Sequence, residues 1–335
     1  MSDHPGTADD ALLAEEIAAE AGRRLLALRA GHEPAGLDGT AAGRTARLRD
    51  AGDKLSHEYI TAELARRRPH DAVLSEEGPA VTGRPARLTA DRVWIVDPLD
   101  GTREFGEPGR SDWAVHVALW QRTHAAAGQA WDRASARAAD QAAGHAPDRT
   151  ADQVPDRTAD QAAGRLTAGA VALPAQGVTL TTRNGAKSGA ARANAGAARV
   201  NAGAAETGPA RKPLRIVVSR SRCPPIAESV AELLGAELVP LGSAGAKVGA
   251  VMAGAADVYI HAGGFYEWDT AAPVAVAGSA GFHASHLDGG PLRFNREDVW
   301  TPDILVCPAA LAGTLLNAIA AVRSGQFTGD APAIG

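Results

Sequence analysis

Three short acidic segments hold the residues of this 335-residue chain whose types and spacing could do chemistry. They are SEEG at 75–78, WIVDPLDGTREF at 94–105 and EWDTAAP at 267–273. In the middle segment we expect a buried strand to end at Asp97, where Pro98 imposes a turn before Asp100. Such a turn would bring both carboxylates and the backbone carbonyl of Leu99 to one point. Hard oxygen atoms of this kind are the ligands that Mg²⁺ prefers.

The spacing of Asp97 and Asp100 allows two other interpretations. A pair of aspartates in a turn, taken alone, is more often part of a solvated loop than of a metal site. Aspartyl-phosphate phosphatases also carry a signature that ends in Asp-Gly-Thr, but their nucleophile and acid lie two residues apart. Because Asp97 and Asp100 are three residues apart, the spacing excludes that class.

The elements that must position these segments follow from hydrophobic periodicity. Residues 7–30 and 53–68 have apolar side chains near helical spacing and predict two helices, the second stopped by Pro69. Residues 71–77 and 91–98 predict buried strands that deliver carboxylates to one edge of a sheet. Residues 113–120 predict a further strand, with 166–182 as its partner. From residue 214 onward, predicted strands and helices alternate, which indicates an α/β second half.

Two stretches rich in small residues divide the chain. From about 123 to 165 the sequence repeats short polar units such as DRTADQ, with too few large apolar side chains to offset the entropy of ordering. We expect a disordered insertion there and a low-complexity linker at 186–212. The predicted organisation is an N-terminal α+β portion over 1–185 and a C-terminal α/β portion over 213–335.

Composition and charge exclude several classes of protein. Lys and Arg number 34 against 39 Asp and Glu, a formal net charge of −5, so no basic field is present to bind a nucleic-acid polymer. Two cysteines, Cys223 and Cys307, are too few for a disulfide framework and fit a reducing compartment. The polar start and the lack of an apolar run of about 18 residues predict no signal peptide and no membrane span. We expect a cytoplasmic protein.

The three acidic motifs, in this order, resemble those of the inositol monophosphatase superfamily of lithium-sensitive, magnesium-dependent phosphomonoesterases. That superfamily includes inositol monophosphatases, fructose-1,6-bisphosphatases and 3'(2'),5'-bisphosphate nucleotidases. The phrases GTREF, GRSDWAVHVALW, SRSR and GSAGAK are most similar to those of the CysQ-type nucleotidases, particularly the actinobacterial ones. The resemblance implies an α+β, layered αβαβα sugar-phosphatase fold, with a metal site between the N-terminal and C-terminal portions.

The resemblance also implies roles for individual residues. Two or three Mg²⁺ ions would be held by Glu76, Asp97, the Leu99 carbonyl, Asp100 and Asp269. Glu77 is expected to point away, because neighbouring strand side chains face opposite sides.

A water activated by the metal would be the nucleophile, and Thr102 with Asp53 resembles the pair that activates it in the family. Asp53 has a second interpretation as the N-cap of the helix that is predicted to begin there. The two interpretations are not exclusive.

Substrate contacts are inferred in the same way. Backbone amides of Gly101 and Thr102, and a helix that Asp269 opens, would face the reacting phosphate. A second phosphate needs cations and hydrogen-bond donors, for which the candidates are Arg103, Ser219, Arg220, Ser221, Arg222, Gly242, Ser243 and Lys247. GSAGAK is one residue longer than the GSSLK of relatives, which leaves the contact of Ser243 open. Four histidines are expected to be structural, namely His116, His261, His283 and His286.

The activity implied is hydrolysis of the 3'-phosphate of 3'-phosphoadenosine 5'-phosphate to AMP, as part of sulfur assimilation, with the 5'-phosphosulfate as a second substrate. The alternatives are an inositol-1-phosphate or fructose-1,6-bisphosphate phosphatase and, from another class, an inactive phosphonucleotide-binding protein. The expected partner is a phosphorylated small molecule. Assembly into a homodimer is left open.

Overall fold

The computed structural model describes residues 7–31, 41–78, 85–123, 163–184 and 213–326. The expected linker at 186–212 lies outside these residues, and so does most of the expected insertion at about 123–165. The end of that insertion belongs to a strand, because β4 (Gly164–Leu173) begins before residue 165. Within the described residues, no helix is long and apolar enough to cross a lipid bilayer.

Two long helices form the first layer. The predicted helix at 7–30 is α1 (Thr7–Gly31), with Asp9 and Asp10 in its first turn, where acidic side chains favour the helix dipole. The second helix, α2 (Ala41–Arg67), begins twelve residues before the expected start at residue 53. Asp53 therefore lies in the interior of α2, and the N-cap interpretation of this residue is wrong.

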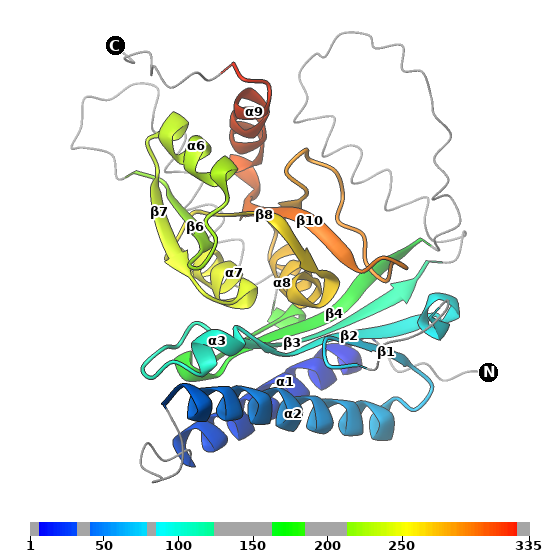
Figure 1. Cartoon of the computed structure of the whole chain (residues 1–335). Helices are drawn as coiled ribbons and strands as arrows, with labels where there is room; N and C mark the ends of the chain where they lie inside the picture. Colours follow the sequence, from blue (N-terminus) through cyan, green and yellow to red (C-terminus); the bar gives the residue numbers. More distant parts are fainter. Residues whose placement is uncertain (1–6, 32–40, 79–84, 124–162, 185–212, 327–335) are drawn as a thin grey trace.

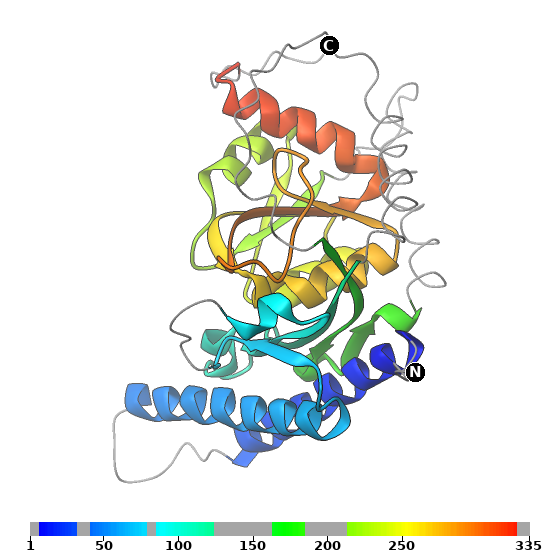
Figure 2. The same ribbon diagram turned by 90° about the vertical axis from the view of Figure 1, so that its right-hand side faces the viewer.

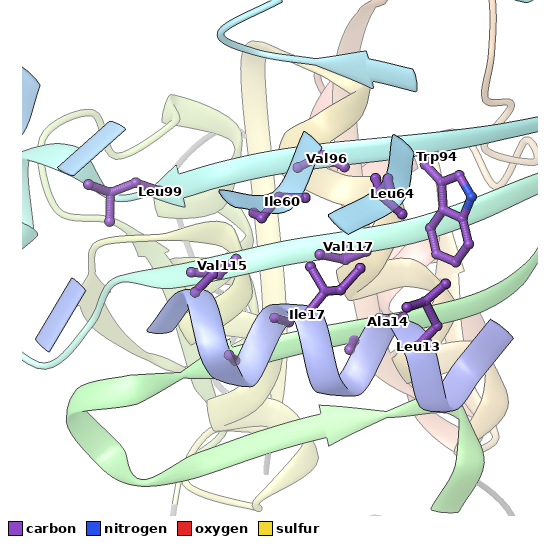
Figure 3. Close-up of a cluster of buried hydrophobic side chains, with 14 of the residues drawn as sticks. Leu13, Ala14, Ile17, Ile60, Leu64, Trp94, Val96, Leu99, Val115 and Val117 are labelled. Atoms are coloured by element: carbon purple, nitrogen blue, oxygen red, sulfur yellow. The ribbon is translucent and has the colours of Figure 1, made fainter. Parts of the chain in front are cut away.

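The first sheet lies on these helices and has the order β1-β2-β3-β4-β5. Its other strands are β1 (Ala72–Ser75), β2 (Arg92–Asp100), β3 (Ala114–Arg122) and β5 (Val178–Thr181). β1 is parallel to β2, and the remaining neighbours are antiparallel, including the predicted pair β3 and β4. Apolar side chains of β2 and β3 pack against Leu13, Ile17 and Ile60 of the two helices (Figure 3). This core holds the strand that carries the central acidic motif.

The second sheet is built from the C-terminal portion, in the order β7-β6-β8-β10-β9. It comprises β6 (Arg215–Ser219), β7 (Glu237–Leu241), β8 (Val258–Tyr266), β9 (Phe282–Ser285) and β10 (Trp300–Pro308). Helices α6 (Pro225–Leu234) and α9 (Ala312–Arg323) cover its outer face. The alternation of strands and helices predicted for this half is present, and β9 is an additional strand.

Helices α7 (Ala244–Met252) and α8 (Glu267–Ser279) lie between the two sheets (Figure 1). They contact β3 and β4 on one side and strands of the second sheet on the other. The turned view shows the same succession of helix pair, sheet, helix pair, sheet and helix pair (Figure 2). This is the expected layered αβαβα arrangement. The middle helices are rich in alanine and glycine, which lets both sheets approach them closely.

Candidate active site and metal centre

The central acidic motif lies in a strand that contains an irregularity, not after a strand that has ended. β2 continues to Asp100, and its pairing with β3 matches Asp97 with His116 and Asp100 with Ala114. Three steps along β2 thus correspond to two along β3, so β2 holds one extra residue. In a regular strand, residues three apart point to opposite faces. The extra residue therefore lets both carboxylates face the middle helices, a common use of a bulge beside an active site.

One oxygen of Asp100 is enclosed by groups from other elements. Its Oδ2 accepts hydrogen bonds from the Ser243 hydroxyl at 2.5 Å and the Gly245 N–H at 2.9 Å, and His116 Nε2 lies 3.2 Å away. Ser243 Oγ also accepts the Ala246 N–H and so caps the start of α7. The orientation of Asp100 is therefore set largely by the C-terminal portion of the chain.

Glu76 and Asp269 reach the same region from two other elements. Glu76 directly follows β1, and its N–H donates to the carbonyl of Val96, the neighbour of Asp97, at 3.3 Å. Asp269 is the third residue of α8, and its Oδ2 accepts the N–H of Tyr266 at 2.7 Å. The helix thus begins two residues before Asp269, so this residue does not open it as expected. Glu76 and Asp269 remain close enough to the central motif to affect its charges.

The carboxylates of this cluster perturb one another. Burial, and after it the charges of Glu76 and Asp100, raise the pKa of Asp97 well above its ordinary value. Burial and the charge of Asp100 raise the pKa of Asp269 to about 7, and desolvation raises that of Glu76 to about 6. Buried like charges at this density need a cation to ionise together.

The donor set fits a hard divalent cation such as Mg²⁺, because the predicted ligands offer only oxygen atoms. Ligand atoms of Asp97, Asp100 and His116 lie within 4.8 Å of one another. The Leu99 carbonyl accepts the Thr102 hydroxyl at 3.0 Å. Glu77, beside Glu76, is exposed and raises the pKa of Asp53 through its charge.

Thr102 and Asp53 lie next to the carboxylate cluster. Thr102 Oγ1 lies 3.3 Å from Asp53 Oδ1. The helix that carries Asp53 approaches closely at Gly52, where a Cβ atom would come within 2.8 Å of the Phe105 ring and 3.0 Å of Leu99. Burial and the charges of the two glutamates after β1 raise the pKa of Asp53 to about 7. A carboxyl group with such a pKa is half ionised near neutral pH.

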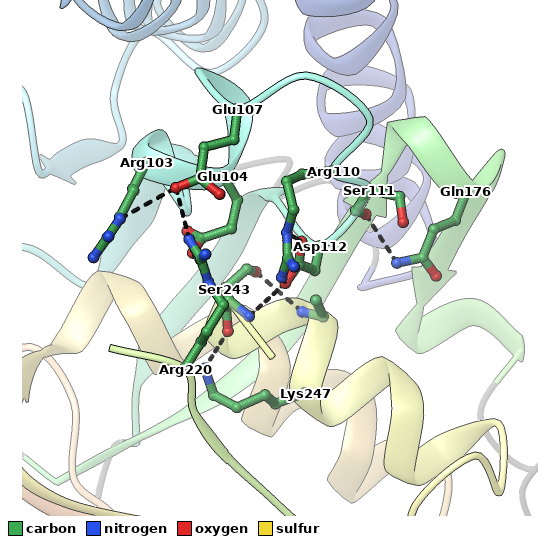
Figure 4. Close-up of polar contacts among 12 residues, drawn as sticks. Arg103, Glu104, Glu107, Arg110, Ser111, Asp112, Gln176, Arg220, Ser243 and Lys247 are labelled. Atoms are coloured by element: carbon green, nitrogen blue, oxygen red, sulfur yellow. Dashed lines mark hydrogen bonds and ion pairs between the residues drawn. The ribbon is translucent and has the colours of Figure 1, made fainter. Parts of the chain in front are cut away.

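Two of the arginines predicted to bind substrate are already paired with acidic residues (Figure 4). Arg220 Nη2 donates to Glu104 Oε1 at 2.7 Å and to Glu107 Oε1 at 2.9 Å. The guanidinium of Arg103 is exposed and lies 3.3 Å from Glu107 Oε1. Arg220 thus connects the end of β6 to α3 (Thr102–Phe105) and to Glu107, which lies two residues beyond the end of that helix. Its charge is neutralised by two carboxylates.

A cavity beside Asp100 and Asp269 brings most of the other predicted substrate contacts together. It is lined by Ser219, Ser221, Arg222, Gly242, Ser243 and Lys247, among others. Lys247 is buried, and its ammonium donates to the Gly242 carbonyl and lies 5.3 Å from the centre of the Tyr259 ring. Arg222 is exposed, and no described acidic residue pairs with its guanidinium. Gly101 and Thr102 are not among the lining residues.

Sequence reasoning missed three polar residues that support this site. Glu104 pairs with Arg220, and the buried Asp112 accepts the Gly242 N–H at 2.6 Å. His116, expected to be structural, lies against Asp100. The sequence does contain a signal that His116 faces the site. His116 lies between Val115 and Val117 in the strand, and these two valines face the first helix layer. His116 must therefore face the middle helices.

Comparison with known proteins agrees with this arrangement. A model of the inositol monophosphatase family matches residues 10–145 and 159–324. The chain is 41% identical over 317 residues to the 3'-phosphoadenosine 5'-phosphate phosphatase of Mycobacterium leprae, covering 95% of this chain and 96% of that one. It is 26% identical over 257 residues to the 3'(2'),5'-bisphosphate nucleotidase CysQ of Escherichia coli, covering 76% and 83%.

Solved structures show the same fold. CysQ from Bacteroides thetaiotaomicron, a bacterial member of the inositol monophosphatase family, aligns with a TM-score of 0.56 at 25% identity, covering 89% of this chain and 96% of that one. The inositol monophosphatase TM1415 of Thermotoga maritima aligns with a TM-score of 0.56 at 16% identity, covering 95% and 99%. The match of the family model over most of the sequence, together with the acidic motifs gathered between the two sheets, shows that this chain belongs to the inositol monophosphatase family.

Proposed function

We propose that this chain is a Mg²⁺-dependent phosphatase that hydrolyses the 3'-phosphate of 3'-phosphoadenosine 5'-phosphate to give AMP and phosphate. One observation carries the proposal. A cluster of carboxylates, buried at Asp97 and Asp100 of β2 and joined by the residue after β1 and the first turn of α8, borders a cavity whose Arg222 has no acidic partner among the described residues. The 41% identity to a phosphatase named for this substrate supports it.

The proposed Mg²⁺ ligands are Glu76, Asp97, the Leu99 carbonyl, Asp100 and Asp269. When bound, Mg²⁺ would polarise the phosphoryl oxygens and neutralise the charge that develops on them during displacement. The chain itself provides a path for the proton of the attacking water. Thr102 can pass a proton to Asp53, whose pKa of about 7 allows it to accept one at neutral pH.

The second phosphate of a bisphosphate nucleotide needs a cation that is not already neutralised. Arg220 bonds to Glu104 and Glu107, which leaves it little capacity for an anion. Arg222 lines the same cavity without an acidic partner among the described residues. We therefore assign the second phosphate to Arg222, with the nearby Ser219 and Ser221 hydroxyls as additional donors.

No specific contact favours inositol 1-phosphate or fructose 1,6-bisphosphate. The likeness to solved inositol monophosphatases lies below 25% identity and shows the fold alone. An inactive binding protein would need neither the carboxylate cluster nor the Thr102 and Asp53 pair. The cavity beside Asp269, where Arg222 pairs with no acidic residue of the described part of the chain, fits a substrate that carries two separated anionic groups.

A phosphate-release panel tests the proposal. The substrates are 3'-phosphoadenosine 5'-phosphate, its 5'-phosphosulfate, inositol 1-phosphate and fructose 1,6-bisphosphate, each with Mg²⁺, with EDTA and with added lithium. We expect the highest kcat/KM for the adenosine bisphosphate, no release in EDTA and inhibition by lithium. A higher kcat/KM for inositol 1-phosphate would contradict the proposed substrate.

A further inference from the structure

His116 is a buried imidazole at the point where the metal-binding elements meet. It lies in the middle of β3, and its side chain has no exposed surface. Nε2 lies 3.2 Å from Asp100 Oδ2 in β2, and Nδ1 lies 3.3 Å from the carbonyl oxygen of Trp268. Trp268 directly precedes Asp269 in α8. One ring therefore contacts both an acidic residue of the first sheet and the turn of helix that presents another.

The start of α7 is shaped to admit this ring. A Cβ atom on Gly245 would lie 2.3 Å from His116 Nε2, so only glycine leaves room for the imidazole. The N–H of the same glycine donates to Asp100 Oδ2 at 2.9 Å, and the Ser243 hydroxyl donates to that oxygen at 2.5 Å. The ring, the peptide N–H and the hydroxyl thus surround one carboxylate oxygen. Together they prevent rotation of Asp100 about its side chain.

We propose that His116 is a positioning residue that holds Asp100 in the orientation needed to bind metal. The inference rests on the proposed function, because that proposal makes Asp100 a metal ligand. The imidazole contacts Oδ2, which already accepts two hydrogen bonds, so it supports the carboxylate from behind and leaves Oδ1 for the cation. Groups that orient metal ligands typically change metal affinity or activity about 10–100-fold when they are removed.

Three substitutions separate positioning from packing. His116→Gln keeps an amide nitrogen near the place of Nε2 and so keeps a polar group beside Asp100 Oδ2. His116→Asn keeps a nitrogen near the place of Nδ1 only. His116→Leu fills the space with no polar group. We expect Mg²⁺ affinity, measured by calorimetry, to fall about 10–100-fold in the Leu and Asn variants and less than about threefold in the Gln variant.

A substitution on the facing helix tests the same contact independently. Gly245→Ala places a methyl group against Nε2 and should displace the ring, so we expect a loss of Mg²⁺ affinity like that of His116→Leu. The matched control is Gly313→Ala in α9, where a Cβ atom meets nothing within 4 Å. This control should bind Mg²⁺ as the unchanged protein does. Circular dichroism and thermal unfolding in EDTA check that each variant is folded.

Three outcomes would overturn the proposal. The first is an unchanged Mg²⁺ affinity in His116→Leu, which would leave a packing role only. The second is a Gln variant as weak as the Asn variant. The third is a nitrogen hyperfine coupling in the pulsed EPR spectrum of the Mn²⁺-loaded protein that disappears in His116→Leu, which would make His116 a direct ligand. If His116→Leu does not fold, the Gln and Asn pair and Gly245→Ala decide the question.

The metal measurements also separate this proposal from the proposed function. The protein could bind Mg²⁺ in a way that depends on Asp97 and on His116 and yet not hydrolyse the adenosine bisphosphate. That result would reject the proposed substrate and keep the positioning role. If the protein hydrolyses that substrate and the His116→Leu variant has normal Mg²⁺ affinity and normal kcat, the proposed substrate is kept and the positioning role is rejected.

Discussion

Two clusters of buried carboxylates lie on opposite faces of β2, and they are neutralised in different ways. On the side of the first two helices, the fully buried Asp10 accepts hydrogen bonds from Arg68 at 2.9 Å and Arg92 at 3.0 Å. Asp71 accepts from Arg92 and from the indole N–H of Trp94. Asp10 and Asp71 are thus each paired with an arginine of the same chain.

The cluster on the side of the middle helices has no such partners. No arginine or lysine forms an ion pair with Asp97, Asp100 or Asp269 anywhere in the described ranges, although the buried Lys247 lies near enough to lower the pKa of Asp269 in part, and His116 lies 3.2 Å from Asp100. Burial and mutual repulsion accordingly raise the pKa of Asp97 and of Asp269. The comparison shows that burial alone does not mark a functional carboxylate. What marks it is burial without an ion pair to an arginine or a lysine.

The largest expected effect is that of removing one charge from the unpaired cluster. Asp97→Asn should lower kcat for phosphate release at least about a hundredfold, because a ligand should matter at least as much as the groups that orient it. In EDTA the same variant should unfold at a higher temperature, since repulsion within the cluster falls. Steady-state kinetics and calorimetry measure the two effects.

Glu58→Gln, a change on the exposed face of α2, is the control for Asp97→Asn and should alter neither quantity. Full Mg²⁺-dependent turnover in Asp97→Asn would refute the metal assignment. A lower melting temperature in EDTA would refute the repulsion argument.

The second effect comes from breaking the paired cluster. Asp10→Asn leaves Arg68 and Arg92 buried with less neutralising charge, so the free energy of unfolding should fall by about 3–5 kcal/mol. The kcat of the folded protein should stay within twofold, because Asp10 is not among the residues of the site. Urea unfolding provides the measurement. Glu20 forms surface ion pairs with Arg23 and with Arg24. Glu20→Gln should therefore lower the free energy of unfolding by only about 0.5 kcal/mol or less.

The third effect is a pH dependence that we expect of the unpaired cluster and not of the paired one. The pKa of Asp269, about 7, lies above its ordinary value. In EDTA the stability from this shift should be complete below about pH 4 and lost as pH rises through 7. Because Mg²⁺ binds the ionised carboxylates, the rise in melting temperature on adding Mg²⁺ should be larger at pH 8 than at pH 5. An equal rise at both pH values would contradict this account.

The smallest effect concerns two arginines that line the cavity, of which Arg220 is paired with acidic residues and Arg222 has no such partner among the described residues. Arg222→Met should raise KM for the adenosine bisphosphate about tenfold, since a hydrogen bond to a charged group contributes about 1.5–3 kcal/mol. Arg220→Met should change KM by less than about threefold, because that guanidinium is paired with Glu104 and Glu107. Each variant is the control for the other, and the opposite ranking would assign the second phosphate to Arg220.

Much of the fold could be predicted because the patterns that carry it are local. The helix at 7–30 and the pairing of 113–120 with 166–182 follow from periodicity and are present in the structure. The predicted start of α2 is twelve residues too late, because residues 41–52 lack an apolar repeat. That part of the helix is held by contacts such as the one between Gly52 and Phe105, which join residues far apart in sequence.

The sequence by itself determined which oxygen donors are available to the site. The carboxylates and the Leu99 carbonyl all belong to short acidic motifs, and each motif can be recognised from residues that are close together in sequence. Tertiary structure alone decided which charges are free. Arg220 and Arg222 lie two residues apart and have the same side chain, yet only one meets Glu104. His116 similarly becomes significant only where β2, α7 and α8 converge. The physical reason is that the pKa of a charged group, and its capacity to bind, depend on the partners that folding brings within a few ångströms.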